Sequence, residues 1–176
     1  TPDRVRETPF NWLAPHIHGA RVLDLFAGSG ALGLEALSRG AASAVFVDND
    51  REAVAALHGR CTDWSTASRE AGSKVGNAEF HRADSLAFLA GRPAAPFDIV
   101  FLDPPSFSNS ARMEGALDVQ RDHVALLRAA LVQLAPGGSL YFSTNRRSFR
   151  LDTDALADLH VRDITEPSID PDFRGG

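Results

Sequence analysis

The sequence predicts an α/β protein with a doubly wound, mostly parallel sheet that has helices on both faces. Apolar runs of strand length alternate along the chain with stretches of helical spacing. Each run is apolar almost throughout, which is typical of strands buried on both faces of a parallel sheet. The 176 residues are enough for one core of ordinary size, so a single domain is expected.

The strand candidates are rich in Val, Ile, Leu and Phe, and five are expected, at residues 21–26, 43–48, 78–84, 97–103 and 138–145. Between them the spacing predicts helices at 31–39, 50–62, 84–90 and 117–134. A weaker helix is expected at 153–159 and a further strand at 160–165, and loops are expected at 65–77 and 104–116.

The single domain over 1–176 is expected to have three parts: an N-terminal helical segment at 1–18, a sheet core at 19–166 and a truncated tail at 167–176. Thr1 and Pro2 are typical of a helix N-cap and first turn. Pro9 is expected to stop or kink that helix.

Composition and charge exclude several functional classes. The net charge of −5 argues against a surface that grips nucleic acid over its whole extent, although it allows a local basic patch. No apolar run approaches the roughly 20 residues that cross a bilayer, so no membrane partner is expected. Cys61 is the one cysteine, which excludes an internal disulfide and a cysteine-rich zinc site. We expect a cytoplasmic protein with no metal.

The stretch "VLDLFAGSGALGLEAL" (residues 22–37) is the first candidate ligand site. In an open α/β sheet, ligands bind beyond the carboxyl ends of the strands, where this strand turns into its helix. The turn lacks the Gly-Lys-Ser/Thr ending of a P-loop, which disfavours a triphosphate. Its Gly-x-Gly-x-x-Gly spacing (28, 30, 33) would by itself suggest a dinucleotide.

Acidic residues at three strand ends favour another ligand. Asp24 is expected to face the pocket, where it would repel a pyrophosphate and attract a cationic amine. Asp48 suits ribose hydroxyls, and Asp84 with Ser85 suits an adenine amino group. An amine, a ribose and an adenine without phosphate describe S-adenosylmethionine. The expected cofactor-binding residues are Asp24, Phe26, Ala27, Gly28, Ser29, Gly30, Asp48, Asn49, Asp84, Ser85 and Asp103.

A simpler interpretation is that these carboxylates cap helices or lie in loops and that the glycines only turn the chain. The fourth strand adds a further signal, "FLDPPSFSNS" (residues 101–110). Successive prolines hold the Asp103 side chain and nearby carbonyls in a rigid acceptor array, and Phe107 suits stacking on a planar base. Methyl transfer gains mostly from such alignment. The expected catalytic residues are Asp103, Pro104, Pro105 and Phe107, whereas a plain turn with Phe107 in the core is the alternative.

At these motifs the chain resembles S-adenosylmethionine-dependent ribosomal RNA guanine methyltransferases. "TPDRVRETPFNWL" through "DLFAGSGALGLEALSRGAASAVFVDND" resembles the small-subunit guanine-N2 family. "FDIVFLDPPSFSNSARMEGALDVQRDHVALLRAAL" and "GGSLYFSTNRRSFRLD" are similar to the large-subunit guanine-N7 family, the K half of the bifunctional K/L protein. The resemblance implies a Rossmann-like class I methyltransferase fold, here expected to lack its last antiparallel strand.

The two resemblances differ over the atom that is methylated. Exocyclic-amine enzymes typically carry an aromatic residue directly after Asn/Asp-Pro-Pro, but here Ser106 intervenes before Phe107. Ring N7 has an in-plane lone pair and no proton to remove. We therefore favour N7 of a guanine in 23S rRNA, with N2 in 16S rRNA as the alternative. Carbon-5 methylation of cytosine needs a cysteine nucleophile near the active-site strands, and Cys61 is expected far from them.

Arginines after the fourth and fifth strands are expected to contact RNA phosphates around a flipped guanine. The residues are Arg112, Arg121, Arg146, Arg147 and Arg150. The alternative is that Arg121 and His123 lie on a solvated helix face and that the later arginines pair with Asp152 and Asp154. The resemblance to the K/L protein implies a separate RNA-binding domain outside this chain. Two rival functions stay open: a cofactor-binding module that is inactive without that domain, and methylation of a protein or small molecule.

Overall fold

The computed structural model describes residue 10 and residues 13–105 and 117–165. In chain order its elements are β1 (Arg21–Leu25), α2 (Ala31–Ser38), β2 (Ser43–Asp48), α3 (Arg51–Glu70), β3 (Asn77–Arg82), α4 (Ser85–Leu89), β4 (Phe97–Leu102), α5 (Val119–Leu131) and β5 (Leu134–Phe142). Residues 13–17 are also helical, within the expected N-terminal helical segment. Thr1, Pro2, Pro9 and the tail at 167–176 lie outside the described residues.

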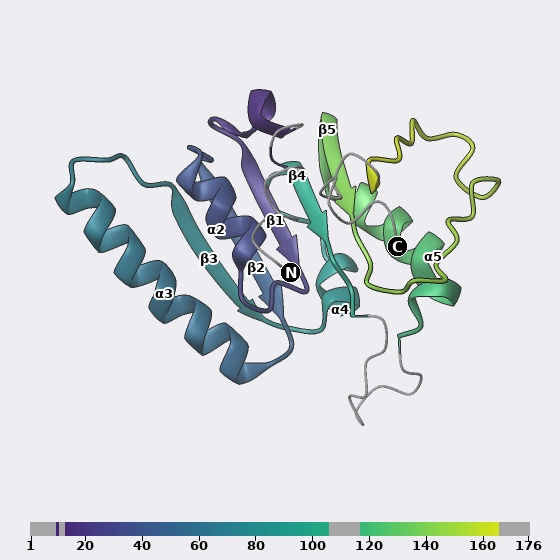
Figure 1. The fold of residues 1–176 in the computed structure, drawn as a ribbon, viewed down its shortest axis with the longest axis horizontal. Helices are drawn as coiled ribbons and strands as arrows, with labels where there is room; N and C mark the ends of the chain where they lie inside the picture. The colour runs from purple at the N-terminus through teal and green to yellow at the C-terminus, as the bar shows by residue number, and fades with distance from the viewer. Residues whose placement is uncertain (1–9, 11–12, 106–116, 166–176) are drawn as a thin grey trace, which may run out of the picture.

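The five strands form one sheet in the order β3-β2-β1-β4-β5, and every neighbouring pair is parallel. Figure 1 shows this twisted sheet, with α2 and α3 on the side of β1–β3 and α5 beside β5. The order reverses between β1 and β4, so the chain winds outward from β1 in both directions. The predicted doubly wound α/β fold is confirmed.

Strand alternation divides the core into two apolar clusters. In β1, Val22 belongs to the cluster with α2 and α3, whereas Leu23 and Leu25 belong to the cluster with α4 and α5. Because successive side chains point to opposite faces of a sheet, a strand that is apolar at every position has both faces covered. Phe10 and Ile17, fully buried, extend the first cluster to the N-terminal helical residues.

Three helices begin at aspartates whose side chains accept backbone N–H groups of the first turn. Asp50 caps α3, Asp84 caps α4 and Asp118 caps α5. Such caps satisfy donors that have no partner inside the helix. Two of these helices follow directly after strands, so the capping aspartates also lie at the carboxyl edge of the sheet.

Helix α3 is longer than the sequence predicts. The expected loop at 65–77 begins only after Glu70, because α3 continues through a polar stretch to that residue. Polar side chains cost little on an exposed helix face, and Arg69 in the last turn interacts favourably with the helix dipole.

Strand β5 begins at Leu134, four residues before the expected start. Leu134 pairs with Phe97, but the next pairing joins Ser139 to Ile99, so the intervening residues bulge. Gly137 has a φ of 78° within this bulge. Pro136 and Gly137 therefore mark an irregularity inside the strand rather than the turn that precedes it.

The helix expected at 153–159 and the strand expected at 160–165 are wrong. Residues 153–158 form turns, and residues 160–164 have no regular structure. Side chains of α5 hold the preceding segment in place. The Gln120 side chain exchanges two hydrogen bonds with the backbone of Arg150, and the N–H of Asp152 donates to His123 Nε2 at 3.0 Å. These bonds pair with backbone N–H and C=O groups that hydrogen bonds of a helix or sheet would otherwise pair with.

The described residues contain neither a membrane-spanning helix nor a cluster of metal ligands. None of their helices is long and apolar enough to cross a membrane. Within the same part of the chain, no group of three or more His, Cys, Asp or Glu side chains could hold a metal ion.

Candidate functional site

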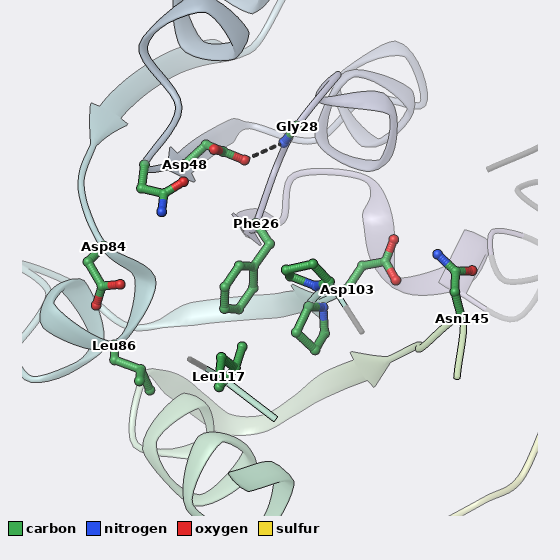
Figure 2. A pocket seen from close by; sticks show the side chains of 11 residues that line it. Phe26, Gly28, Asp48, Asp84, Leu86, Asp103, Leu117 and Asn145 are labelled. Carbon is green, nitrogen blue, oxygen red and sulfur yellow. Dashed lines mark hydrogen bonds between the residues drawn. The ribbon is translucent and has the colours of Figure 1, made fainter. Parts of the chain in front are cut away.

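A cleft of about 280 Å³ lies at the carboxyl edge of the sheet, where β1 and β4 part. Figure 2 shows its long shape: Asp84 and Leu86 at one end, Asp48 and Gly28 in the middle, and Asp103 with Asn145 at the other end. The Phe26 ring lies between them. The described lining residues are Phe26, Gly28, Asp48, Asn49, Asp84, Leu86, Asp103, Pro104, Pro105, Leu117 and Asn145.

Four backbone N–H groups of the glycine turn and the first turn of α2 already have partners in the protein. Gly28 N donates to Asp48 Oδ2 at 2.8 Å, and Gly33 N donates to Asp24 Oδ2 at 2.9 Å. Ala27 N and Gly30 N donate to backbone carbonyls. A pyrophosphate would need such N–H groups free. The turn therefore does not offer the donor set of a dinucleotide site, despite its glycine spacing.

Two glycines of the motif allow close packing. A Cβ on Gly30 would lie 2.1 Å from a methyl carbon of Leu57, and the φ of Gly30 is 70°. A Cβ on Gly33 would lie 2.3 Å from the ring of Phe46. The spacing thus brings α2 and its turn against α3 and β2, and Gly30 is needed both for its φ and for space.

Asp24 lies elsewhere than predicted. Strand alternation turns it toward α2, where it is 2% exposed and is not among the residues that line the cleft. Its carboxylate accepts from Gly33 N in the first turn of α2, whose N-cap residue Gly30 has no side-chain cap. Asp24 therefore supplies that missing cap from the neighbouring strand. This is close to the alternative interpretation, in which the carboxylates cap helices.

Burial raises the pKa of Asp24 to about 7. The Gly33 N–H opposes this shift, whereas the nearby charges of Asp103 and Asp48 add to it. Asp48, at the end of β2, and Asp103, directly after β4, are thus close enough to Asp24 for their charges to disfavour its ionisation. A cation in the cleft would relieve this repulsion.

Asp48 and Asp84 both line the cleft and both also hold backbone. Asp48 accepts from Gly28 N and from Asp50 N, each at 2.8 Å. Asp84 Oδ1 accepts from Ala87 N at 2.9 Å. A carboxylate has about four lone-pair positions, so each can accept further hydrogen bonds from a ligand.

Asp103 marks the other end of the cleft. Its Oδ1 accepts from Ser143 Oγ at 2.5 Å. Pro104 and Pro105 line the cleft beside it, and Asn145 faces it from beyond β5 in Figure 2. A carboxylate, a carboxamide and rigid proline rings are suited to orienting a flat polar molecule.

Eight of the predicted site residues line the cleft: Phe26, Gly28, Asp48, Asn49, Asp84, Asp103, Pro104 and Pro105. Four other predicted residues do not line the cleft: Ala27, Ser29 and Ser85, which are next to lining residues in the chain, and Gly30, which is not. Phe107 and Arg112 lie outside the described residues. The sequence reasoning missed Leu86, Leu117 and Asn145, of which only Asn145 gave a signal, as the polar last residue of a predicted strand.

The remaining predicted RNA-binding arginines differ in their surroundings. Arg147 and Arg150 are exposed. Arg146 pairs with Asp118 at 2.8 Å, and Arg121 pairs with its neighbour Asp122 at 2.6 Å. Asp118 and Asp122 thus offset part of the positive charge beside the cleft.

His123 and Cys61 are both buried. His123 is 3% exposed, so the alternative that placed it on a solvated helix face is wrong. Its Nε2 accepts from Asp152 N, which leaves Nδ1 to donate to Gln120 O. Cys61 is buried in α3 and does not line the cleft, as predicted.

One protein-family model matches most of the chain. The family model described as "Conserved hypothetical protein 95" matches residues 1–141. The chain belongs to this family. The family match therefore covers the whole glycine turn, the Asp-Pro-Pro motif and all but the end of β5.

Relatives of this family member carry methyltransferase names. The ribosomal RNA large subunit methyltransferase K/L of Pseudomonas putida (strain GB-1) is 41% identical over 155 residues, which are 88% of this chain and 20% of that protein. The chain spans about a fifth of the length of the curated relatives it matches.

Two solved structures are also similar. A protein described as a "putative methylase", from Haemophilus influenzae, is 33% identical over 86% of this chain and 84% of its own, with a TM-score of 0.59. An Escherichia coli protein described as a "putative methyltransferase" is 47% identical over 58% of this chain and 52% of its own, with a TM-score of 0.51.

Proposed function

We propose that this domain is an S-adenosylmethionine-dependent methyltransferase acting on ribosomal RNA. The observation that carries the proposal is the acidic cleft at the ends of neighbouring parallel strands. Asp48, Asp84 and Asp103 line it, and the described lining residues include no lysine or arginine. A phosphate-bearing ligand would be repelled there, whereas the sulfonium and ammonium groups of S-adenosylmethionine are attracted.

The order of groups along the cleft fits the parts of this cofactor. Asp84 and Leu86 offer an acceptor and an apolar contact to the adenine, and Asp48 offers acceptors to the ribose hydroxyls. Asp24 acts by holding the first turn of α2 through Gly33 N, rather than as the direct contact to the amine that the sequence predicts. Asp103 then lies at the end where the methyl group leaves.

The relatives support ribosomal RNA as the acceptor. The K/L proteins are named for the large-subunit RNA, and this domain matches them over nearly nine-tenths of its length. Within that class we propose N7 of a guanine in 23S rRNA. The lone pair of N7 needs alignment but no proton removal, and Asp103, Asn145 and the two prolines provide polar and rigid contacts for alignment. Guanine N2 of 16S rRNA is the second candidate.

RNA contacts are proposed for the exposed arginines after β5. Arg147 and Arg150 follow the strand that ends beside Asp103, so phosphates flanking a flipped base would lie within their reach. Most of the RNA affinity is proposed to come from another domain, because this chain carries a net charge of −5. We also propose that the protein acts in the cytoplasm, where ribosomal RNA is found.

Methyl transfer to unmodified ribosomal RNA tests this function. The domain is incubated with labelled S-adenosylmethionine and either ribosomal RNA, and the labelled nucleoside is mapped. We expect 7-methylguanosine in the large-subunit RNA. A different nucleoside would contradict the N7 proposal, and labelled protein without labelled RNA would contradict the RNA substrate.

The rival proposal is a cofactor-binding module that needs a partner domain to act. It is favoured by the length comparison, because the curated relatives are about five times as long as the aligned part. It predicts cofactor binding by this chain alone, with methylation only after an RNA-binding domain is added.

A further inference from the structure

The end of β5 places a hydroxyl group against the carboxylate proposed to lie beside the methyl group. Ser143 Oγ donates to Asp103 Oδ1 at 2.5 Å, although the two residues are 40 positions apart. Ser143 N also donates to the carbonyl of Leu102, at 3.0 Å. Ser143 is therefore hydrogen-bonded to the end of β4 at two points, the Leu102 carbonyl and the Asp103 side chain.

This hydrogen bond supplies an orientation that the prolines do not. Pro104 and Pro105 fix their own φ angles and so constrain the backbone after Asp103, but, contrary to the expectation from the sequence, they do not hold the Asp103 side chain, whose rotamer can still change. The bond from Ser143 occupies Oδ1, and Asp103 still lines the cleft. Among the described residues Oδ2 has no hydrogen-bond partner, so it is available to a molecule in the cleft with its direction set.

The electrostatic surroundings make this bond more important. Burial is the main cause of the raised pKa values of Asp24 and Tyr141, and the charge of Asp103 adds to both. Asp103 and Asp24 repel each other when both are ionised, which favours other rotamers of Asp103, and a hydrogen-bond donor to Asp103 opposes this. Ser143 is such a donor, and a neutral one, so it holds Asp103 without cancelling the negative charge of the cleft.

We propose that Ser143 is a positioning residue: its hydroxyl holds the Asp103 carboxylate in the orientation that aligns the acceptor base with the methyl donor. The inference rests on the proposed function. Ser143 moves no proton in the reaction and is not among the residues that line the cleft. Its effect is on alignment, which methyl transfer depends on strongly.

The first test compares Ser143→Ala and Ser143→Thr with a control on the same strand. Ser139→Ala removes a hydroxyl four residues earlier, inside β5, where Ser139 pairs with Ile99 rather than with the end of β4. Single-turnover methylation of ribosomal RNA should slow roughly 10- to 100-fold in Ser143→Ala, the effect of losing one hydrogen bond to a charged group. Ser143→Thr keeps the hydroxyl and should stay within about 3-fold of wild type, as should Ser139→Ala.

Binding measurements separate positioning from general damage. The dissociation constant for S-adenosylmethionine should change by less than about 3-fold in Ser143→Ala, because the loss is in alignment rather than in cofactor contact. In an Asp103→Ala background, Ser143→Ala should slow the reaction by less than about 2-fold further. Two independent losses that multiply would overturn the proposal.

A crystal structure of Ser143→Ala gives a readout without turnover. We expect the Asp103 side chain to adopt a different or a second rotamer, whereas it should have one in the wild type. An unchanged Asp103 would overturn the positioning role. If the wild type shows no methyl transfer, the proposed function fails while this comparison still decides the role of Ser143.

A matched pair covers the case in which Ser143→Ala does not fold. Thr and Val have nearly the same shape, so Ser143→Thr and Ser143→Val differ mainly in the hydroxyl. The Val variant should reproduce the slow methylation and the altered Asp103 rotamer. Equal rates and equal Asp103 rotamers in the two variants would overturn the proposal.

Discussion

Burial of the Asp24 carboxyl group makes the stability of the fold depend on pH. The pKa of this group is about 7 in the folded protein, against 3.8 for an ordinary aspartate. Between these two pH values the unfolded chain has released a proton that the folded chain keeps. The folded state therefore loses stability as the pH rises from about 4 to about 7, by up to about 4 kcal/mol.

Asp24→Asn should remove most of this pH dependence. The asparagine oxygen can still accept from Gly33 N, but it carries no charge. Measured by urea denaturation, the fall in unfolding free energy between pH 4.5 and 7.5 should be smaller in the variant by at least about 2 kcal/mol. Asp63→Asn, which removes an exposed charge on α3, is the control. Parallel curves for wild type and Asp24→Asn would contradict the assignment.

At the cleft itself, Asp48 is proposed to contact the cofactor ribose. Asp48→Ala should weaken S-adenosylmethionine binding roughly 10-fold or more, because hydrogen bonds to a charged acceptor are lost. Glu52→Ala removes a nearby exposed charge on α3 that does not line the cleft. Equal weakening of binding in both variants, measured by calorimetry, would mean that the loss comes from the overall negative charge near the cleft rather than from a contact to Asp48.

At the scale of helices and strands, substitutions at two glycines should change the stability of the protein in opposite directions. Gly30→Ala would place a methyl group 2.1 Å from Leu57 and strain a φ of 70°. We expect a loss of about 2 kcal/mol or more in unfolding free energy. Gly59 lies within α3, and a Cβ there would meet nothing within 4 Å. Gly59→Ala should therefore stabilise the protein, by about 0.5–1 kcal/mol.

Thermal or urea unfolding of the two variants checks both predictions. A stable Gly30→Ala variant would mean that Leu57 moves aside easily and that the turn tolerates a side chain. A destabilised Gly59→Ala variant would mean that α3 does not continue through this part of the chain.

The segment after β5 depends on α5 rather than on a sheet. Gln120→Ala removes both side-chain bonds to Arg150, so it should destabilise the protein by about 1–2 kcal/mol. Hydrogen exchange should speed up at Arg150 and Asp152 and stay unchanged in β1. Unchanged exchange at both residues would contradict the role assigned to α5.

The order of elements could be predicted from the sequence because buried parallel strands are apolar at every position. The exceptions have local causes. Pro136 and Gly137 lie inside β5 because a bulge accommodates them, which the pattern of apolar residues does not reveal. Residues 160–165 alternate like a strand, but α5 side chains hold the preceding segment, and the described chain has no strand beside it.

Asp48, Asp84 and Asp103 could be predicted for the cleft because each is the last residue of a predicted strand, and the carboxyl ends of parallel strands meet at one edge of the sheet. The position of Asp24 could not be predicted, because successive side chains of a strand point to opposite faces of the sheet. A shift of one residue decides whether a side chain near the strand end faces the ligand or the neighbouring helix. Leu86 and Leu117 carry no signal in the sequence, since apolar residues at helix ends usually belong to the core.

Across the whole molecule, the described fold has one acidic cleft at the carboxyl edge of its sheet that combines these features, and its surroundings match a cationic nucleoside better than a phosphate. The glycine turn holds its own N–H groups, and carboxylates from four strands lie near the cleft. Everything proposed about methyl transfer depends on that match.

Isothermal titration of S-adenosylmethionine into the wild-type domain tests it most directly. We predict heat from one site per chain that weakens as salt rises, because charge attraction contributes to binding. ATP, which carries the same adenosine with phosphates, should give no heat at the same concentration. A folded domain that gives no heat with S-adenosylmethionine, or that binds ATP as well, would contradict the account.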